Sequence, residues 1–193
     1  MTIRTVRWVI IAIMLPFAVA GCADRPGRAS VGERPAREFH LVENLCDQLD
    51  HERLSAASGG TPVKTRTVPG RTGHTSRCAL STGSPSTGVS MLQVDTEIGE
   101  PPTGEPRLYS HHREISGVGD HAQIELPPAL TADLDSPVIE GPTSSRICTL
   151  TVVEGTARIR VQWTNHARKL LSDADTEALL VAYARETLHL MGS

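Results

Sequence analysis

Two neighbouring segments, residues 147–153 and 157–163, constrain the fold most strongly, because apolar and polar side chains alternate along both of them. The residues that share one side are Cys148, Leu150 and Val152 in the first segment and Ile159, Val161 and Trp163 in the second. A period of two is the pattern of a β-strand with one buried face. Because only Glu154-Gly155-Thr156 separates the segments, we expect a β-hairpin with Cys148 on its buried side.

Further strands are indicated by short segments rich in threonine and valine, which glycine and proline separate. The predicted strands are residues 63–68, 75–81, 89–98, 109–115 and 122–126. Residues 100–106 contain three prolines, which remove backbone donors, so we expect a loop there. A second loop is predicted for residues 127–144.

Helix patterns precede and follow these strands in the sequence. Ser172 can cap a helix over residues 173–190, and acidic residues occupy its first turn, where the helix dipole favours them. Its expected inward-facing residues are Leu179, Leu180, Tyr183, Thr187 and Leu190. Earlier in the chain, Asp50 can cap a short helix through Ser55, which Gly59-Gly60 ends. Together the elements predict an α+β fold, an antiparallel sheet of about five to seven strands packed by an N-terminal and a C-terminal helix.

The first 22 residues have the pattern of a lipoprotein leader. Two arginines precede an apolar run, and Val19-Ala20-Gly21-Cys22 places small residues directly before a cysteine. The run has about a dozen residues, whereas a membrane-spanning helix needs about 20. We therefore predict a signal peptide over residues 1–21 and lipidation of Cys22.

The leader implies how the rest of the chain is organised. A polar tether is expected over residues 22–38, because it has almost nothing apolar to bury, and a single domain over residues 39–193. Acyl chains on Cys22 would hold the protein in the cell membrane, at its extracytoplasmic face. The predicted partner is therefore the membrane itself, reached through the lipid anchor.

Charge and aromatic content exclude some classes of partner. The chain has 19 basic and 22 acidic residues, and removal of the two leader arginines leaves a net charge of −5. Nucleic-acid binders present basic patches, so we expect no nucleic-acid partner. Only Phe39, Tyr109, Trp163 and Tyr183 remain as aromatic residues, which disfavours stacking on bases or sugars.

The other three cysteines, Cys46, Cys78 and Cys148, would face an oxidising space, where disulfides form. Cys46 begins a helical segment and Cys78 lies in a strand that can cross it, so we favour this bridge and expect Cys148 to be a free buried thiol. A bridge between Cys78 and Cys148 stays open as the alternative, because connectivity does not follow from sequence alone. No pair has the spacing of zinc ligands.

Histidines are the other residues that could support chemistry. His111, His112 and His121 form the densest group, but neighbours on a strand point to opposite faces and no further ligand follows at helical spacing. We therefore predict neither a metal site nor a cofactor. The chain also has no G-x-S-x-G or H-E-x-x-H motif, so we assign no catalytic residue.

Between the leader and the final hairpin and helix, the chain contains three short motifs: Leu45-Cys46-Asp47-Gln48-Leu49, Arg77-Cys78-Ala79-Leu80 and Gly117-Val118-Gly119-Asp120-His121-Ala122. In their kind and order these features resemble the actinobacterial DUF3558-type lipoproteins. Leu80 stands where the family has tryptophan, and Cys148 is an additional thiol. The resemblance implies an antiparallel sheet packed by two helices and a bridge between Cys46 and Cys78.

These observations predict a non-catalytic lipoprotein of the cell envelope that binds a small or lipidic ligand or an envelope protein. A hydrolase or metal-dependent enzyme built on His111, His112, His121 and Asp120 is the first alternative. A structural spacer of the cell wall is the second. An apolar cleft between sheet and helix would favour a ligand, whereas a filled core with an exposed apolar patch would favour a protein partner.

Overall fold

The computed structural model describes residues 37–60, 62–69, 73–84, 88–99, 112–132 and 143–193. The chain divides into residues 1–34 and 35–193, and all the described residues belong to the second unit. The predicted signal peptide, Cys22, most of the tether and the predicted loop at 100–106 lie outside the described residues. None of the described helices is long and apolar enough to span a membrane.

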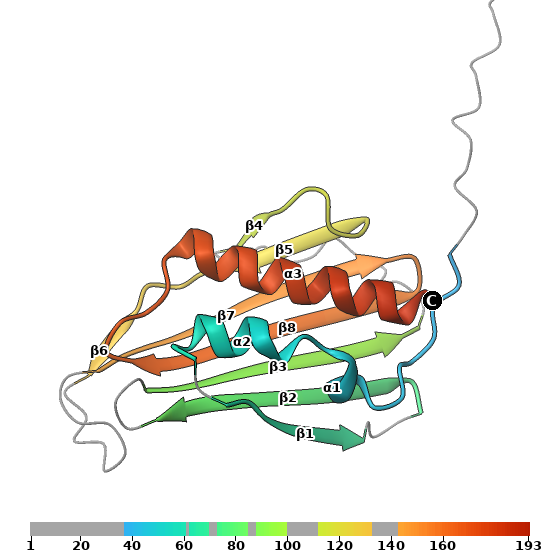
Figure 1. The fold of residues 1–193 in the computed structure, drawn as a ribbon. Helices are drawn as coiled ribbons and strands as arrows, with labels where there is room; N and C mark the ends of the chain where they lie inside the picture. Colours follow the sequence, from blue (N-terminus) through green and yellow to red (C-terminus); the bar gives the residue numbers. More distant parts are fainter. Residues whose placement is uncertain (1–36, 61, 70–72, 85–87, 100–111, 133–142) are drawn as a thin grey trace, which may run out of the picture. The chain divides into compact units, whose positions relative to one another are not determined.

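In the described residues, eight antiparallel strands form one sheet (Figure 1), with the order β1-β2-β3-β8-β7-β5-β4 and with β6 also paired to β7. The strands are β1 Lys64–Pro69, β2 Thr75–Ser84, β3 Gly88–Ile98, β4 His112–Glu114, β5 His121–Glu125, β6 Leu130–Ala132, β7 Thr143–Glu154 and β8 Ala157–Ala167. The α+β class is confirmed, with one strand more than the largest number expected. That strand is β6.

The predicted hairpin is strands β7 and β8. Cys148 pairs with Trp163, Leu150 with Val161 and Val152 with Ile159, and all six side chains are buried. Gly155 turns the chain with φ 54°, a conformation that favours glycine. Both the hairpin and the buried position of Cys148 are therefore confirmed.

The loop predicted for residues 127–144 is wrong in part. Leu130–Ala132 forms β6, which pairs with the first residues of β7, and β7 already begins at Thr143. A strand of three residues has too short a pattern to be recognised in a sequence. It forms because the long β7 provides an edge to which it can hydrogen-bond.

The helices are α1 Leu45–Gln48, α2 His51–Ala57 and α3 Asp173–Met191. Both predicted caps are present: Asp50 accepts from the backbone N–H of Arg53, and Ser172 accepts from that of Asp175. The inward stripe of α3 differs at its end, where Leu188 and Met191 are buried and Leu190 is only half-buried. The buried residues of α3 recur with the helical period up to its last turn, and this period places Met191, three residues after Leu188, on the buried side.

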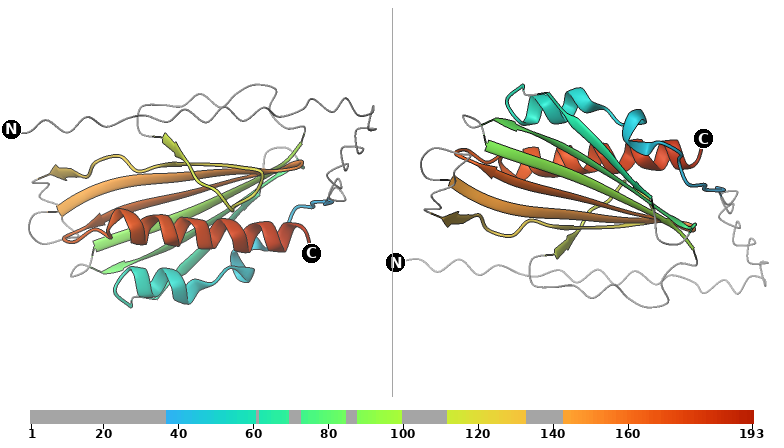
Figure 2. Two further views of the ribbon diagram at one scale, coloured as in Figure 1. Left: turned by 90° about the horizontal axis from the view of Figure 1, so that it is seen from above. Right: turned by 90° about the horizontal axis from the view of Figure 1, so that it is seen from below.

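All three helices lie on one side of the sheet (Figure 2), where α3 packs on β7 and β8 and α1 packs on β1 and β2. The core fills this layer, and Leu80, Leu92, Leu180 and Tyr183 are fully buried. The Tyr183 hydroxyl donates to the carbonyl oxygen of Asp50 at 2.5 Å, which joins α3 to the start of α2. We call this side of the sheet the covered face and the other side the open face.

Candidate binding surface on the open face

The open face carries the alternate residues of every strand. Residues directly opposite one another in antiparallel strands point to the same side, so the register defines rows that cross the sheet. One row consists of Arg66, Ala79, Gln93, Gln162, Thr149, Glu125 and His112. None of these side chains is among the buried residues, and most are polar, as expected for a sheet side that faces water.

Apolar side chains gather at one end of this face. The exposed large apolar residues of the described chain are Val89, Met91, Leu130 and Ile147, with exposed fractions of 39, 40, 72 and 49%. The register places Val89, His166, Ser145 and Leu130 in one row and Met91, Thr164 and Ile147 in the next. We call Val89, Met91, Leu130 and Ile147 the apolar patch. Clustering of this kind marks interaction surfaces, whereas scattered exposed apolar residues do not.

Sequence reasoning did not identify the apolar patch. Ile147 was within a predicted strand, and the alternation that buries Cys148 already places Ile147 on the opposite face. Leu130 fell in a predicted loop. The sequence therefore showed only that some apolar residues occupy strand positions where the alternation predicts a polar one. The strand order is needed to show that four such residues lie together.

Charged residues form two neighbouring columns at the other end of the open face. Asp95 and Glu97 lie on β3, and their partners across the strand boundary are Arg160 and Arg158 on β8. Asp95 also forms an ion pair with Arg77 of β2 and accepts from Gln93 Nε2 at 2.9 Å. The acidic strand thus lies between two basic ones.

The histidines do not converge. His112 Nε2 lies 3.1 Å from Glu125 Oε2, while His121 is exposed at the other end of β5, about 13 Å further along the strand. His111 lies outside the described residues. In the described part of the chain, no three His, Cys, Asp or Glu side chains are close enough to hold a metal ion.

The Gly117-x-Gly119 turn has a structural explanation. Asp120 accepts from the backbone N–H of Gly155 at 2.8 Å and so joins this turn to the β7–β8 hairpin. A Cβ atom at Gly119 would lie 2.6 Å from the side chain of Val152, and its φ is 61°. The glycine is required by this close approach rather than by a phosphate.

The cysteines pair as the favoured prediction states. Cys46 of α1 is bonded to Cys78 of β2, which ties the helical layer to the sheet, and Cys148 is a free buried thiol. Burial raises the pKa of the Cys148 thiol to about 11, although the Arg146 guanidinium opposes the shift. At neutral pH the thiol is therefore protonated, and it lies three strands away from the bridge.

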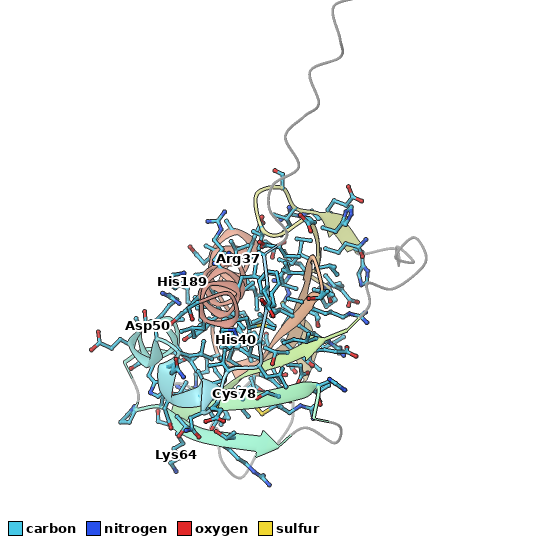
Figure 3. All side chains as sticks on the ribbon, turned by 90° about the vertical axis from the view of Figure 1, so that its right-hand side faces the viewer. Arg37, His40, Asp50, Lys64, Cys78 and His189 are labelled. Carbon is cyan, nitrogen blue, oxygen red and sulfur yellow. A yellow bond between two sulfur atoms is a disulfide. The ribbon has the colours of Figure 1, made fainter. Side chains whose placement is uncertain are left out.

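The predicted lipidation site, Cys22, lies outside the described residues. At the end of the domain nearest to it in sequence, Arg37 Nη1 lies 3.8 Å from Glu154 Oε1 beside the β7–β8 turn. The backbone N–H of His40 donates to the carbonyl oxygen of Met191. Figure 3 looks at this end, where Arg37, His40 and His189 are labelled.

Comparisons of the chain with protein-family models, with curated proteins and with solved structures found no match.

Proposed function

We propose that the protein is a non-catalytic lipoprotein of the cell envelope, of DUF3558 type, that is anchored through Cys22 and binds a protein partner on the open face of its sheet. The observation that carries the proposal is the apolar patch. All the large apolar side chains exposed in the described residues lie at one end of one face. A cell-wall spacer would have no need of such a surface.

The filled core favours a protein partner over a ligand held between sheet and helices. Leu80 and Leu92 on the sheet and Leu180 and Tyr183 on α3 are all fully buried. Side chains that exclude water completely leave no room for a second apolar molecule among them. The patch, in contrast, is accessible and has hydrogen-bonding neighbours in Thr164 and Ser145, the combination found at protein interfaces.

The position of the apolar patch suits an anchored domain. Arg37, where the described chain begins, lies at the β7–β8 turn, whereas His166 of the patch row lies about 30 Å further along β8. A domain tethered at Arg37 can thus present the patch away from the membrane. Partners in the envelope, rather than lipid headgroups, would meet it.

The anchor is tested by replacing Cys22 with alanine. We expect the wild-type protein to fractionate with membranes and to carry a diacylglyceryl mass on Cys22, and the C22A variant to carry none. Cys148→Ala is the matched control, because it removes a cysteine that the leader does not address. A wild-type chain without acyl mass would contradict the proposed anchor.

The binding surface is tested by a photo-reactive amino acid at position 147 in intact cells. We expect a crosslinked adduct of one defined mass. Met91→Glu, in the same row on β3 with only β8 between, should abolish it. The same probe at Glu52, exposed on α2, is the control and should give no such adduct. If position 147 gives no adduct, or one that Met91→Glu does not affect, the open face is not the binding surface.

A small amphipathic ligand is the second candidate, and one specific observation favours it. Among the described residues, the buried Trp163 Nε1 has no hydrogen-bond partner. An indole N–H only donates, and leaving it unpaired costs about 1–3 kcal/mol. A ligand oxygen near Trp163 would remove this cost.

This candidate has a direct readout, because Trp8 and Trp163 are the only tryptophans and Trp8 belongs to the predicted leader. Titration with lauric acid would change the Trp163 fluorescence, and native mass spectrometry of protein purified from its membrane would detect a retained ligand. Unchanged fluorescence together with an empty mass spectrum would remove the ligand hypothesis.

A further inference from the structure

Three charged residues of the open face on one side of the boundary between β3 and β8 have a counterpart of opposite sign at the same distance on the other side. On one side of this boundary, β3 is acidic through Asp95 and Glu97, and β1 is basic through Arg66. On the other side, strands at the same distance have the opposite sign: β8 is basic through Arg158 and Arg160, and β5 is acidic through Glu125. Two basic residues have no charged counterpart: Arg77 of β2 lies opposite the uncharged Thr151 of β7, and Lys64 of β1 lies in the row of Met91 and Ile147, beyond the end of β5.

This pattern is self-complementary under one symmetry operation. A two-fold axis that runs parallel to the strands, along the β3–β8 boundary, turns a second copy face to face with the first and keeps every row in place. Asp95 then lies over Arg160 of the second copy, Glu97 over its Arg158 and Arg66 over its Glu125. Among the described residues of the open face, no like charges meet in this arrangement.

We propose that the open face binds a second copy of this chain in this parallel, face-to-face arrangement. The inference deepens the proposed function, on which it rests, by naming the partner of the open face. A closed two-fold interface uses the same surface on both copies, so a self-complementary face is what it requires.

The apolar patch supplies the affinity in this dimer. Because rows are kept, Met91 of one copy lies over Thr164 of the other, next to its Ile147, and Val89 lies over His166. Burial of apolar surface drives association, whereas charge pairs at an interface chiefly determine orientation and exclude other partners. The charged columns therefore determine the register, and the patch provides the favourable free energy.

The open face is large enough for a stable dimer. Strands β2, β3, β7 and β8 have 10 to 12 residues each, and with the shorter β1 and β5 beside them they present a face of roughly 800 Å2. An interface of standard size buries about 800 Å2 on each partner. Twisted sheets also pack face to face at about 10 Å with nearly aligned strands, as this arrangement requires.

The arrangement agrees with anchoring in one membrane. An axis parallel to the strands leaves both β7–β8 turns, and hence both Arg37 residues, at the same end of the dimer. Two chains with a lipid on Cys22 could therefore associate side by side on a single surface. An axis perpendicular to the strands would place the two Arg37 residues at opposite ends.

A charge exchange between Arg66 and Glu125 tests the dimer most sharply. These residues lie on β1 and β5, with β2, β3, β8 and β7 between them, so they do not contact each other within one chain. Native mass spectrometry of the full chain extracted from membranes should show a dimer. Arg66→Glu and Glu125→Arg should each raise the dissociation constant about tenfold, because each places like charges face to face. The double variant should return within about twofold of the wild type.

Glu52→Arg on α2 is the matched control and should leave the dissociation constant unchanged. Met91→Glu should abolish the dimer while the circular dichroism spectrum of the chain stays that of the wild type. A monomer at all concentrations, or a double variant no tighter than the single ones, would overturn the proposal. The native mass spectrum reports the acyl mass on Cys22 separately from the dimer. An adduct between position 147 and a different protein would leave the proposed function standing without the dimer.

Discussion

The covered and open faces belong to the same strands, yet neighbouring residues have opposite environments. On β3, Leu92 is fully buried under the helices, while Met91 is 40% exposed on the other side. Both are large and apolar, so composition does not distinguish them. The comparison shows that the helical layer determines which half of each strand stabilises the fold and leaves the other half free to bind.

Truncation of these two neighbours should separate the faces most clearly. Leu92→Ala should lower the free energy of unfolding by about 3 kcal/mol, because it leaves a cavity in a filled core. Met91→Ala should change it by at most about 0.5 kcal/mol. Urea denaturation at low protein concentration, where association is absent, measures both. Equal effects would mean that the open face is covered as well.

The disulfide, which lies on the covered face, should contribute a similar amount to the free energy of unfolding. Cys46 and Cys78 are 32 residues apart, and their bridge restricts the unfolded chain. A chain with both cysteines changed to alanine should lose about 3 kcal/mol of unfolding free energy. Reduction of the wild type and of Cys148→Ala should reproduce this loss in urea denaturation, while the chain without Cys46 and Cys78 should be unaffected by the reductant. A wild type insensitive to reduction would show that the bridge is not formed.

Alkaline pH should lower the free energy of unfolding through Cys148, which lies on the covered face. Its pKa is raised from 9.0 to about 11 in the folded chain, so above pH 9 the unfolded thiol loses its proton while the folded one keeps it. The contribution of the protonated Cys148 thiol to the free energy of unfolding is therefore fully present below pH 9. It is lost as the pH rises from 9 to 11, which lowers the free energy of unfolding by on the order of 2 kcal/mol. Burial raises the pKa of Tyr183 as well, which acts in the same direction at higher pH. Thermal unfolding of Cys148→Ala should show a smaller decrease over this range, and an equal one would assign the effect elsewhere.

The smallest expected effect concerns the hydrogen bond that holds α2 against α3. Tyr183→Phe removes the hydroxyl that donates to the carbonyl oxygen of Asp50, and it should cost about 1 kcal/mol. Thr149→Val, on the open face, is the comparison and should lie within about 0.5 kcal/mol of the wild type. Differential scanning calorimetry resolves the two, and the interpretation fails if Thr149→Val is the more damaging change.

Local patterns predicted the elements that are long or have clear ends. Strands β7 and β8 follow from alternation, and α3 follows from Ser172 and its acidic first turn. The short β6 and the last turn of α3 were missed or misplaced, because three residues carry no period and because Leu190 and Met191 are equally apolar. The packing of α3 on β7 and β8 determines which of these two residues is buried.

The candidate surface was harder to predict than the fold. Val89, Met91, Leu130 and Ile147 are far apart in the chain, and each is an ordinary apolar residue by itself. Their meeting depends on β8 pairing with β3 rather than with another strand, and strand order depends on contacts between distant segments. The matching of opposite charges across the β3–β8 boundary has the same origin, because Arg66 and Glu125 lie at equal distances from it only in this topology.

The sequence by itself determined the buried hairpin, the capped helices and the burial of Cys148, because hydrophobic period and capping act over a few neighbouring residues. It also carries the prediction of a lipid anchor at Cys22. Only the tertiary structure decided that Cys46 bonds to Cys78, that one face of the sheet is covered, and that four exposed apolar residues share one end of the other face. These properties depend on which distant segments pack together, and local preferences do not specify that choice.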